Sequence, residues 1–135
     1  MDLMESLMIS AAGMRVQGER LRVISENVAN ADSVSEVPGG DPYRRKTITF
    51  QNALDRELGV NLVKVKKVGL DPSEFTRKYD PNNPAADRSG YVKLPNVNAL
   101  IEMNDMREAQ RSYEANLKVI EVSRGMLQRT IDLLR

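Results

Sequence analysis

The stretch from Val97 to Arg135, VNALIEMNDMREAQRSYEANLKVIEVSRGMLQRTIDLLR, decides most of the fold, because it lacks proline and its apolar residues recur at alternating intervals of four and three. The positions that follow this spacing are Ala99, Met103, Met106, Tyr113, Leu117, Ile120, Leu127, Ile131 and Leu134, with polar Gln110 and Arg124 between them. A repeat of 3.5 residues held over several heptads is typical of a helix that packs along a coiled-coil seam. The stretch therefore predicts one long helix that has a helical partner.

The first 33 residues carry the same spacing and also lack proline. The apolar positions are Leu3, Leu7, Met14, Leu21, Ile24, Val28 and Ala31, with Ser10 and Gln17 in the remaining slots. Asn30 and the pair Asp32-Ser33 are suited to end this helix, and Asn96 or Asn98 is suited to cap the second one after Pro95.

The middle of the chain differs, because all six prolines lie between Pro38 and Pro95. Residues 43–50 and 60–67 have the composition of strands, and the dipeptides Asp71-Pro72, Asp80-Pro81 and Asn83-Pro84 predict turns and loop after them. The predicted fold class is α+β. Long N- and C-terminal helices (1–33 and 97–135), each with a coiled-coil seam, flank a small β-rich, loop-rich middle region (34–96).

The length of the two helices suggests other chains as partners. Straight helices over these segments would span roughly 45 and 60 Å, whereas a compact globule of this chain length is about 37 Å across. Their apolar faces would then extend beyond what the middle region can cover. The alternative is a kinked or broken helical bundle, with the breaks at Gly13, Gly18 and Gly125.

The amino-acid composition excludes several classes of catalytic and metal site. The chain has no His, Cys or Trp, and its net charge is +1. Zinc sites built on Cys or His, Ser-His-Asp triads and thiol nucleophiles therefore cannot form within it, and the balanced charge argues against a nucleic-acid or membrane-surface binder. No motif indicates catalysis. We expect no enzymatic activity, cofactor, metal ion, nucleic acid or small-molecule substrate.

A basic cluster, Arg44, Arg45 and Lys46, precedes the first predicted strand. Alternate side chains of a strand point to opposite faces, so the three cannot all face one core. We expect at least one of them to contact an adjacent subunit; the alternative is a solvated surface.

Several motifs resemble a known family. The stretches Ser10–Met14 (SAAGM) and Leu21–Ala31 (LRVISENVANA) are similar to the N-terminal signature of bacterial flagellar rod and hook proteins. The stretches Gly90–Asn98 (GYVKLPNVN) and Arg111–Asn116 (RSYEAN), with Glu102-Met103, resemble the proximal-rod member of the flagellar basal-body rod proteins. The motif positions to which we assign this resemblance are Gly13, Asn27, Asn30, Pro95, Asn96, Glu114 and Asn116.

Two further points of the middle region match that member, and two depart from it. The matching points are Pro42–Lys46 (PYRRK) and Tyr79-Asp80-Pro81. Asn82-Asn83-Pro84 stands where the family often has Gly-His-Pro, and residues 32–36 lack the Thr-rich run common in the family. Neither departure touches the helical ends.

The resemblance implies a structural subunit of the proximal rod in the periplasm, which polymerises through its terminal helices and transmits motor torque. It also implies that the N- and C-terminal helices pair as a coiled coil, the inner-core domain of the axial proteins. The implied partners are copies of itself, other rod proteins including distal subunits, the rod base at the export apparatus and the flagellar export machinery. Export would need no cleaved signal peptide, consistent with an N-terminus that begins with two acids and no base. The alternatives are another axial or needle-type export substrate and a soluble helical-bundle enzyme.

The apolar residues of the two repeats are the predicted assembly seam: Leu3, Leu7, Met14, Leu21, Ile24, Val28, Met103, Met106, Tyr113, Leu117, Ile120, Leu127, Ile131 and Leu134.

Overall fold

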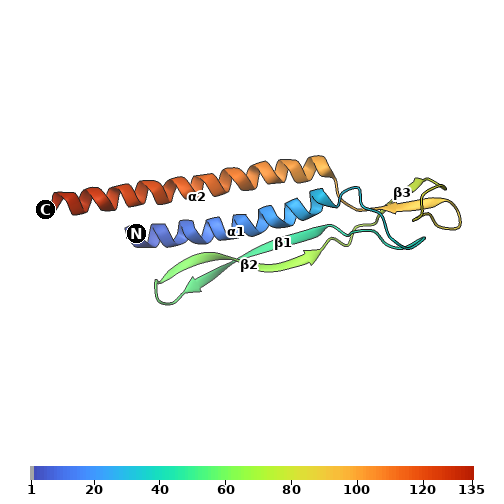
Figure 1. Cartoon of the computed structure of the whole chain (residues 1–135). Coiled ribbons are helices and arrows are strands. Elements are labelled where there is room, and N and C mark those ends of the chain that lie inside the picture. The colour runs from blue at the N-terminus through green and yellow to red at the C-terminus, as the bar shows by residue number, and fades with distance from the viewer. Residues whose placement is uncertain (1) are drawn as a thin grey trace. The chain divides into compact units, whose positions relative to one another are not determined.

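The computed structural model describes residues 2–135, and Figure 1 shows its elements in chain order. Two long helices, α1 (Leu3–Ala29) and α2 (Ala99–Leu133), enclose the four strands in the sequence. The strands are β1 (Lys46–Asp55), β2 (Val60–Leu70), β3 (Thr76–Tyr79) and β4 (Tyr91–Leu94). β1 pairs with β2 and β3 with β4, each pair forming a small two-stranded sheet. The α+β class is therefore confirmed.

The chain forms two compact units, and each unit takes segments from both helices and from the middle region. The first unit contains the residues up to Leu21, Ile48–Lys67 and Arg107–Arg135. The second contains Arg22–Thr47 and Val68–Met106. The division of the sequence at 33/34 and 96/97 stays a prediction about domains.

Both helices are continuous through their glycines. α1 contains Gly13 and Gly18 and α2 contains Gly125 without interruption, so the breaks expected of a kinked bundle do not occur at these three positions. A glycine keeps the backbone N–H and C=O that a helix needs, so it does not by itself break a helix, although it costs about 1 kcal/mol of stability relative to alanine.

Asparagines at the helix ends satisfy backbone groups that the helices leave free. At the start of α2, the Asn98 side-chain oxygen accepts hydrogen bonds from the backbone N–H of Leu100 (3.1 Å) and of Ile101 (3.4 Å), so Asn98 is the N-cap. Asn96, the other predicted cap, bonds elsewhere. After α1, the Asn30 amide donates to the Glu26 carbonyl at 2.8 Å, which confirms that the helix ends at the asparagine.

Small residues form the contact between α1 and α2 in the first unit. A Cβ placed on Gly13 would lie 2.8 Å from Nδ2 of Asn116, so the two helices meet closely at this point. Ala109 is completely buried on α2, and Ser10 is buried on α1. The inward positions of α2 that are buried or half-buried include Ala109, Asn116 and Ser123, which are seven residues apart.

The residues with which α2 faces α1 are not all those of the predicted seam: at two places the buried residue precedes the predicted one by one position. The apolar repeat predicted that Met103 and Leu117 face α1. In the structure Glu102 and Asn116 make the contacts with α1, and Met103 and Leu117 are exposed. Among the predicted seam residues, Ile24 is buried and these are half-buried: Leu3, Leu7, Met14, Leu21, Val28, Met106, Tyr113 and Ile120. The seam residues that the chain leaves exposed are Met103, Leu117, Leu127, Ile131 and Leu134. Small side chains permit the closer helix approach, so the larger ones stay outside.

The prediction of only turns and loop after Asp71 is wrong for two short segments. β3 and β4 pair antiparallel, with Thr76 opposite Leu94 and Tyr79 opposite Tyr91. All four residues of β3 are exposed. Because neither face of the strand is buried, its sequence needs no alternation of apolar and polar residues, and this signal for a strand is missing. The Tyr79 and Tyr91 rings stack edge to face at 5.2 Å, and this cross-strand pair stabilises the register.

A glycine closes the connection between these two strands. Gly90 has φ of +83°, and a Cβ there would lie 2.9 Å from the Tyr79 ring. The Asp87 carboxylate accepts hydrogen bonds from the backbone N–H of Ser89 (2.8 Å) and of Tyr91 (3.0 Å). The turn therefore depends on one glycine and one carboxylate.

The surroundings of Gly13 and Gly18 predict opposite responses to alanine. Nothing lies within 4 Å of a Cβ at Gly18, so Gly18→Ala should raise the free energy of unfolding by about 1 kcal/mol through helix propensity. Gly13→Ala should lack this gain or lower the stability, because the Asn116 amide must move and give up its hydrogen bond to the Ser112 carbonyl. Urea unfolding followed by circular dichroism measures both.

The double variant Gly13→Ala/Asn116→Ala is the control, since it removes the side chain that the new methyl group meets. It should recover stability relative to Gly13→Ala. Equal stabilisation by alanine at both glycines would show that α1 and α2 do not approach closely at Gly13.

Candidate assembly site

A buried asparagine is the centre of a polar network in the second unit. Asn27, near the end of α1, is 1% exposed and uses its amide completely. Its Nδ2 donates to the Lys46 carbonyl (2.9 Å) and to Oε2 of Glu102 (3.2 Å). Its Oδ1 accepts from the Tyr43 hydroxyl (2.8 Å) and from the Lys46 backbone N–H (2.9 Å). One side chain thus joins α1, the start of β1 and α2.

Glu102 lies in the first turn of α2 and is also 1% exposed. Its second oxygen, Oε1, accepts a hydrogen bond from Nε of Arg45, and the guanidinium also pairs with Asp71 at 3.4 Å. Burial opposes the positive charge of Arg45, but the hydrogen bond and charge of Glu102 outweigh it, so the pKa of Arg45 is raised. The buried carboxylate therefore has a cation on one oxygen and an amide on the other.

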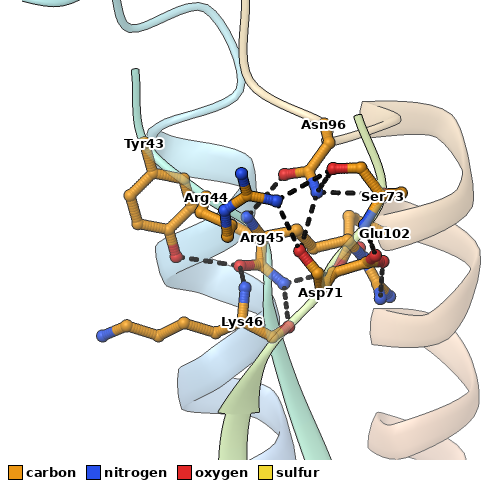
Figure 2. A network of polar contacts seen from close by, with 9 residues as sticks. Tyr43, Arg44, Arg45, Lys46, Asp71, Ser73, Asn96 and Glu102 are labelled. Carbon is orange, nitrogen blue, oxygen red and sulfur yellow. Dashed lines mark hydrogen bonds and ion pairs between the residues drawn. The ribbon is translucent and has the colours of Figure 1, made fainter. Parts of the chain in front are cut away.

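Asn96 fixes the backbone around this ion pair, as Figure 2 shows. Its Oδ1 accepts from the Arg45 backbone N–H at 2.8 Å. Its Nδ2 donates to the Asp71 carbonyl (3.2 Å) and to the Ser73 hydroxyl (2.9 Å). This bonding explains why Asn98, and not Asn96, caps α2.

Arg44 and Lys46 complete the network at its edges. The Arg44 guanidinium donates to the carbonyls of Asp71 and Ser73, each at 2.9 Å, and lies 4.2 Å from the centre of the Phe75 ring. Lys46 pairs with Glu26 at 2.6 Å, and this hydrogen bond lowers the pKa of Glu26 and raises that of Lys46. All three residues of the predicted basic cluster thus have partners within the chain. A contact with an adjacent subunit stays a prediction.

The motif positions chosen from sequence fall into three groups. Asn27 and Asn96 belong to the network, next to Pro95, which is buried. Gly13 and Asn116 form the close helix contact. Asn30 ends α1, and Glu114 is exposed on α2.

Sequence reasoning missed the roles of Asp71, Ser73 and Tyr43. Only one signal was available for them, the Asp-Pro turn at Asp71-Pro72, which indicated a turn and not an ion pair. The pairing of Arg45 with Asp71 spans 26 residues, and no local spacing indicates it.

Large apolar side chains are exposed along α2. Besides the seam residues named above, one further apolar line runs along α2, which we call the outer stripe: Ala115, Val119, Val122, Met126 and Leu133. Its intervals are four, three and four up to Met126, and Arg129 occupies the slot before Leu133. Val119, Val122, Met126 and Leu133 are between 43% and 87% exposed. Apolar surface of this extent is typical of a protein–protein contact. No helix of residues 2–135 is both long and apolar enough to cross a membrane.

Comparison with known proteins places this geometry in a family. Residues 88–133 match the family model described as the flagellar basal body rod FlgEFG protein C-terminal region. A flagellar basal-body rod protein FlgC of Agrobacterium fabrum is 59% identical over 94% of this chain and 91% of its own length. The chain belongs to the FlgC family of flagellar basal-body rod proteins.

The relationship extends to distant bacteria. The FlgC proteins of Salmonella typhimurium and Bacillus subtilis are 39% and 36% identical to this chain, each over 98% of it. Members of the FlgC family are structural subunits of the flagellar basal-body rod and not enzymes. The matched residues 88–133 contain β4 and α2, and therefore Glu102 and the outer stripe. We accordingly interpret the charged network as structural, and we set aside the helical enzyme and the needle-type substrate.

The buried ion pair of Arg45 and Glu102 predicts that the stability losses of single and double variants are not additive. Arg45→Met should lower the free energy of unfolding by about 3–5 kcal/mol, because Glu102 stays buried without its cation. The double variant Arg45→Met/Glu102→Leu should lose less than the two single variants together. Urea unfolding of the four proteins measures the coupling; additive losses would contradict a specific pair. The matched control is Lys46→Met, whose exposed pair with Glu26 should matter little.

Acid should weaken the network through Asp71. Hydrogen bonds from the backbone N–H and hydroxyl of Ser73, and then the charge of Arg45, hold the pKa of Asp71 below its ordinary value of 3.8. A lowered folded-state pKa means that the stability contributed by Asp71 is complete above pH 3.8 and is lost as the pH falls through the lower value. The Asp71→Asn variant keeps an oxygen for Ser73 but cannot titrate. Its stability should therefore fall less steeply below pH 3.8 in thermal melts; an unchanged slope would exclude Asp71 as the group responsible.

Proposed function

We propose that this FlgC-family chain polymerises through its terminal helices with copies of itself and with other rod proteins, and so transmits motor torque along the rod. The exposed apolar residues of α2, among them Leu117, Leu127 and Ile131, carry the proposal. A monomer gains nothing from these side chains in water, whereas an assembly can bury them.

The proposal includes a coiled coil formed by α1 and α2. It is supported by contacts between the two helices within each unit, at Gly13 with Asn116 and at Asn27 with Glu102. The half-buried and exposed members of the predicted assembly seam then continue this packing toward neighbouring subunits. In this arrangement residues 34–96 brace the subunit against its neighbours.

The proposed partners are distal rod subunits, the rod base at the export apparatus and the export machinery. The proposed location is the periplasmic rod of the basal body, reached without a cleaved signal peptide. We include the basic cluster as a second contact between subunits. Lys46 offers more surface for it than Arg45, because its side chain is 38% exposed despite the pair with Glu26, whereas that of Arg45 is 26% exposed.

Torque transmission would depend on the rigidity of each subunit and on the number of contacts. The network of Asn27, Arg45 and Glu102 ties both helices to the middle region, so a force on one helix reaches the others without a hinge at this point. Contacts between subunits can be weak individually, because they repeat around the rod.

A charge on the exposed seam should prevent assembly without unfolding the chain. We predict that Leu117→Asp abolishes motility and removes the protein from isolated basal bodies, because a carboxylate buried between subunits has no evident partner. The isolated variant should keep its helical circular dichroism, since Leu117 is already exposed.

The matched control is Ser25→Asp, which places the same charge on an exposed position of α1. This variant should assemble and swim. Normal swimming of the Leu117→Asp variant would contradict the proposal that this face of α2 is an assembly surface.

A further inference from the structure

Charge is segregated along this nearly neutral chain. Residues 23–43 are the longest stretch without a basic residue, and they contain four acids. Two of these acids pair with lysines elsewhere in the chain, Glu26 with Lys46 and Asp41 with Lys93. The other two, Asp32 and Glu36, are exposed and form no ion pair within residues 2–135. The connection between α1 and β1 thus carries two carboxylates that the chain itself does not neutralise.

These two carboxylates lie on the same side of the connection. Exposed and half-buried positions alternate along it, so that Asp32, Val34 and Glu36 are exposed and the two serines between them are half-buried. The Ser35 hydroxyl donates to the Val37 carbonyl at 2.9 Å and accepts from the Val37 backbone N–H at 3.0 Å. Local hydrogen bonds therefore hold the end of this segment. We call Asp32, Val34 and Glu36 the acidic line.

The complementary charge lies on β2. Residues 58–70 contain no acid but include Lys64, Lys66 and Lys67. All three lysines are exposed, and none forms an ion pair in the part of the chain that the structure describes. Because successive side chains of a strand point to opposite faces, Lys64, Lys66 and Val68 share one face of β2, and Lys67 lies on the other. We call Lys64, Lys66 and Val68 the basic line.

The two lines are complementary in charge and in apolar content. Each combines two charges of one sign with one valine, and Val34 and Val68 are 40% and 42% exposed. A contact between the lines would pair the charges and remove the valines from water, which is the composition of many protein–protein contacts.

The spacing of the charges permits both ion pairs at once. Lys64 and Lys66 are about 7 Å apart along the strand, and four residues of extended chain separate Asp32 from Glu36 by at most about 14 Å. A lysine ammonium lies at the end of a flexible four-carbon stem, so the two side chains can diverge to reach both carboxylates.

We propose that the acidic line of one copy of this chain docks on the basic line of a second copy. The two halves of the contact are different surfaces of the same chain, so the interface is heterologous, and repeating it gives an open array and not a closed dimer. This inference rests on the proposed function, and it adds a contact between copies that lies outside the terminal helices.

Charge reversal tests the pairing. The variant Lys64→Glu/Lys66→Glu should reduce the amount of the chain in isolated basal bodies by about tenfold, because like charges then face each other. Adding Asp32→Lys/Glu36→Lys to the same chain should restore assembly, since every contact is again complementary. The matched control is Lys67→Glu on the opposite face of β2, which should assemble like the parent. Circular dichroism of each isolated variant checks that it folds.

Two results of this experiment would overturn the inference. Lysines that only keep an exposed strand from aggregating would tolerate the reversal, and the Lys64→Glu/Lys66→Glu variant would then assemble normally. A folded fourfold variant that stays out of basal bodies would show that the acidic line is not the partner of these lysines.

Disulfide cross-linking shows whether the contact joins two copies, because the chain has no cysteine of its own. Cells that lack the chromosomal copy would express two differently tagged variants, Val34→Cys and Lys66→Cys. After mild oxidation, isolated basal bodies should contain a disulfide-linked dimer that carries both tags. The matched control replaces Lys66→Cys by Lys67→Cys, which should give about tenfold less dimer because its Cβ points away from the docked copy.

The outcomes separate failure of the docking from failure of the proposed function. Basal bodies that contain both variants without the mixed dimer would overturn the inference, and so would dimers that carry one tag alone, because these join like surfaces. Absence of the parent chain from basal bodies would instead contradict the proposed function. Val68→Cys, which keeps every lysine, repeats the test if the Lys66→Cys variant does not reach basal bodies.

Discussion

The buried contact between Asn27 and Glu102 is the interaction on which the rest of the structure depends. A carboxylate removed from water is costly unless its oxygens are bonded and its charge is balanced. Arg45 supplies the charge and one bond, and Asn27 supplies the other bond. Because Arg45 is also held by Asn96 through its backbone, the position of the ion pair sets the path of the chain where both helices meet the strands. A network in which every member is satisfied favours one arrangement over its alternatives.

The distribution of side-chain size along the helices separates folding from assembly. Gly13, Ala109 and Ser123 are small, and such residues let the two helices approach within one chain. Val122, Met126 and Leu127 are large and apolar, yet they are exposed. A globular protein that worked alone would bury the second set before the first. A rod subunit can bury the large apolar residues against neighbouring subunits, which agrees with the family to which the chain belongs.

The predictions from sequence succeeded where the information is local. The absence of proline and the heptad spacing located both helices, and Asn30 and Asn98 end and begin them as expected. The spacing could not choose between adjacent lines on α2, because Met103 and Leu117 fit an apolar seam better than Glu102 and Asn116 do. Close packing favours small side chains and a paired carboxylate, and these properties depend on the facing helix.

The sequence by itself determined the number and extent of the helices, the composition that excludes Cys and His chemistry, and the motifs that indicate a flagellar rod protein. Periodicity, proline and capping act within a few residues, so one chain suffices to recognise them. Only the tertiary structure decided that Arg44, Arg45 and Lys46 bond to Ser73, Asp71, Glu102 and Glu26, and that β3 pairs with β4. The hydrogen bonds and ion pairs among these residues join positions up to 57 apart in the sequence. The geometry of the folded chain selects these partners, and local sequence preferences, which act over a few residues, contain no information about it.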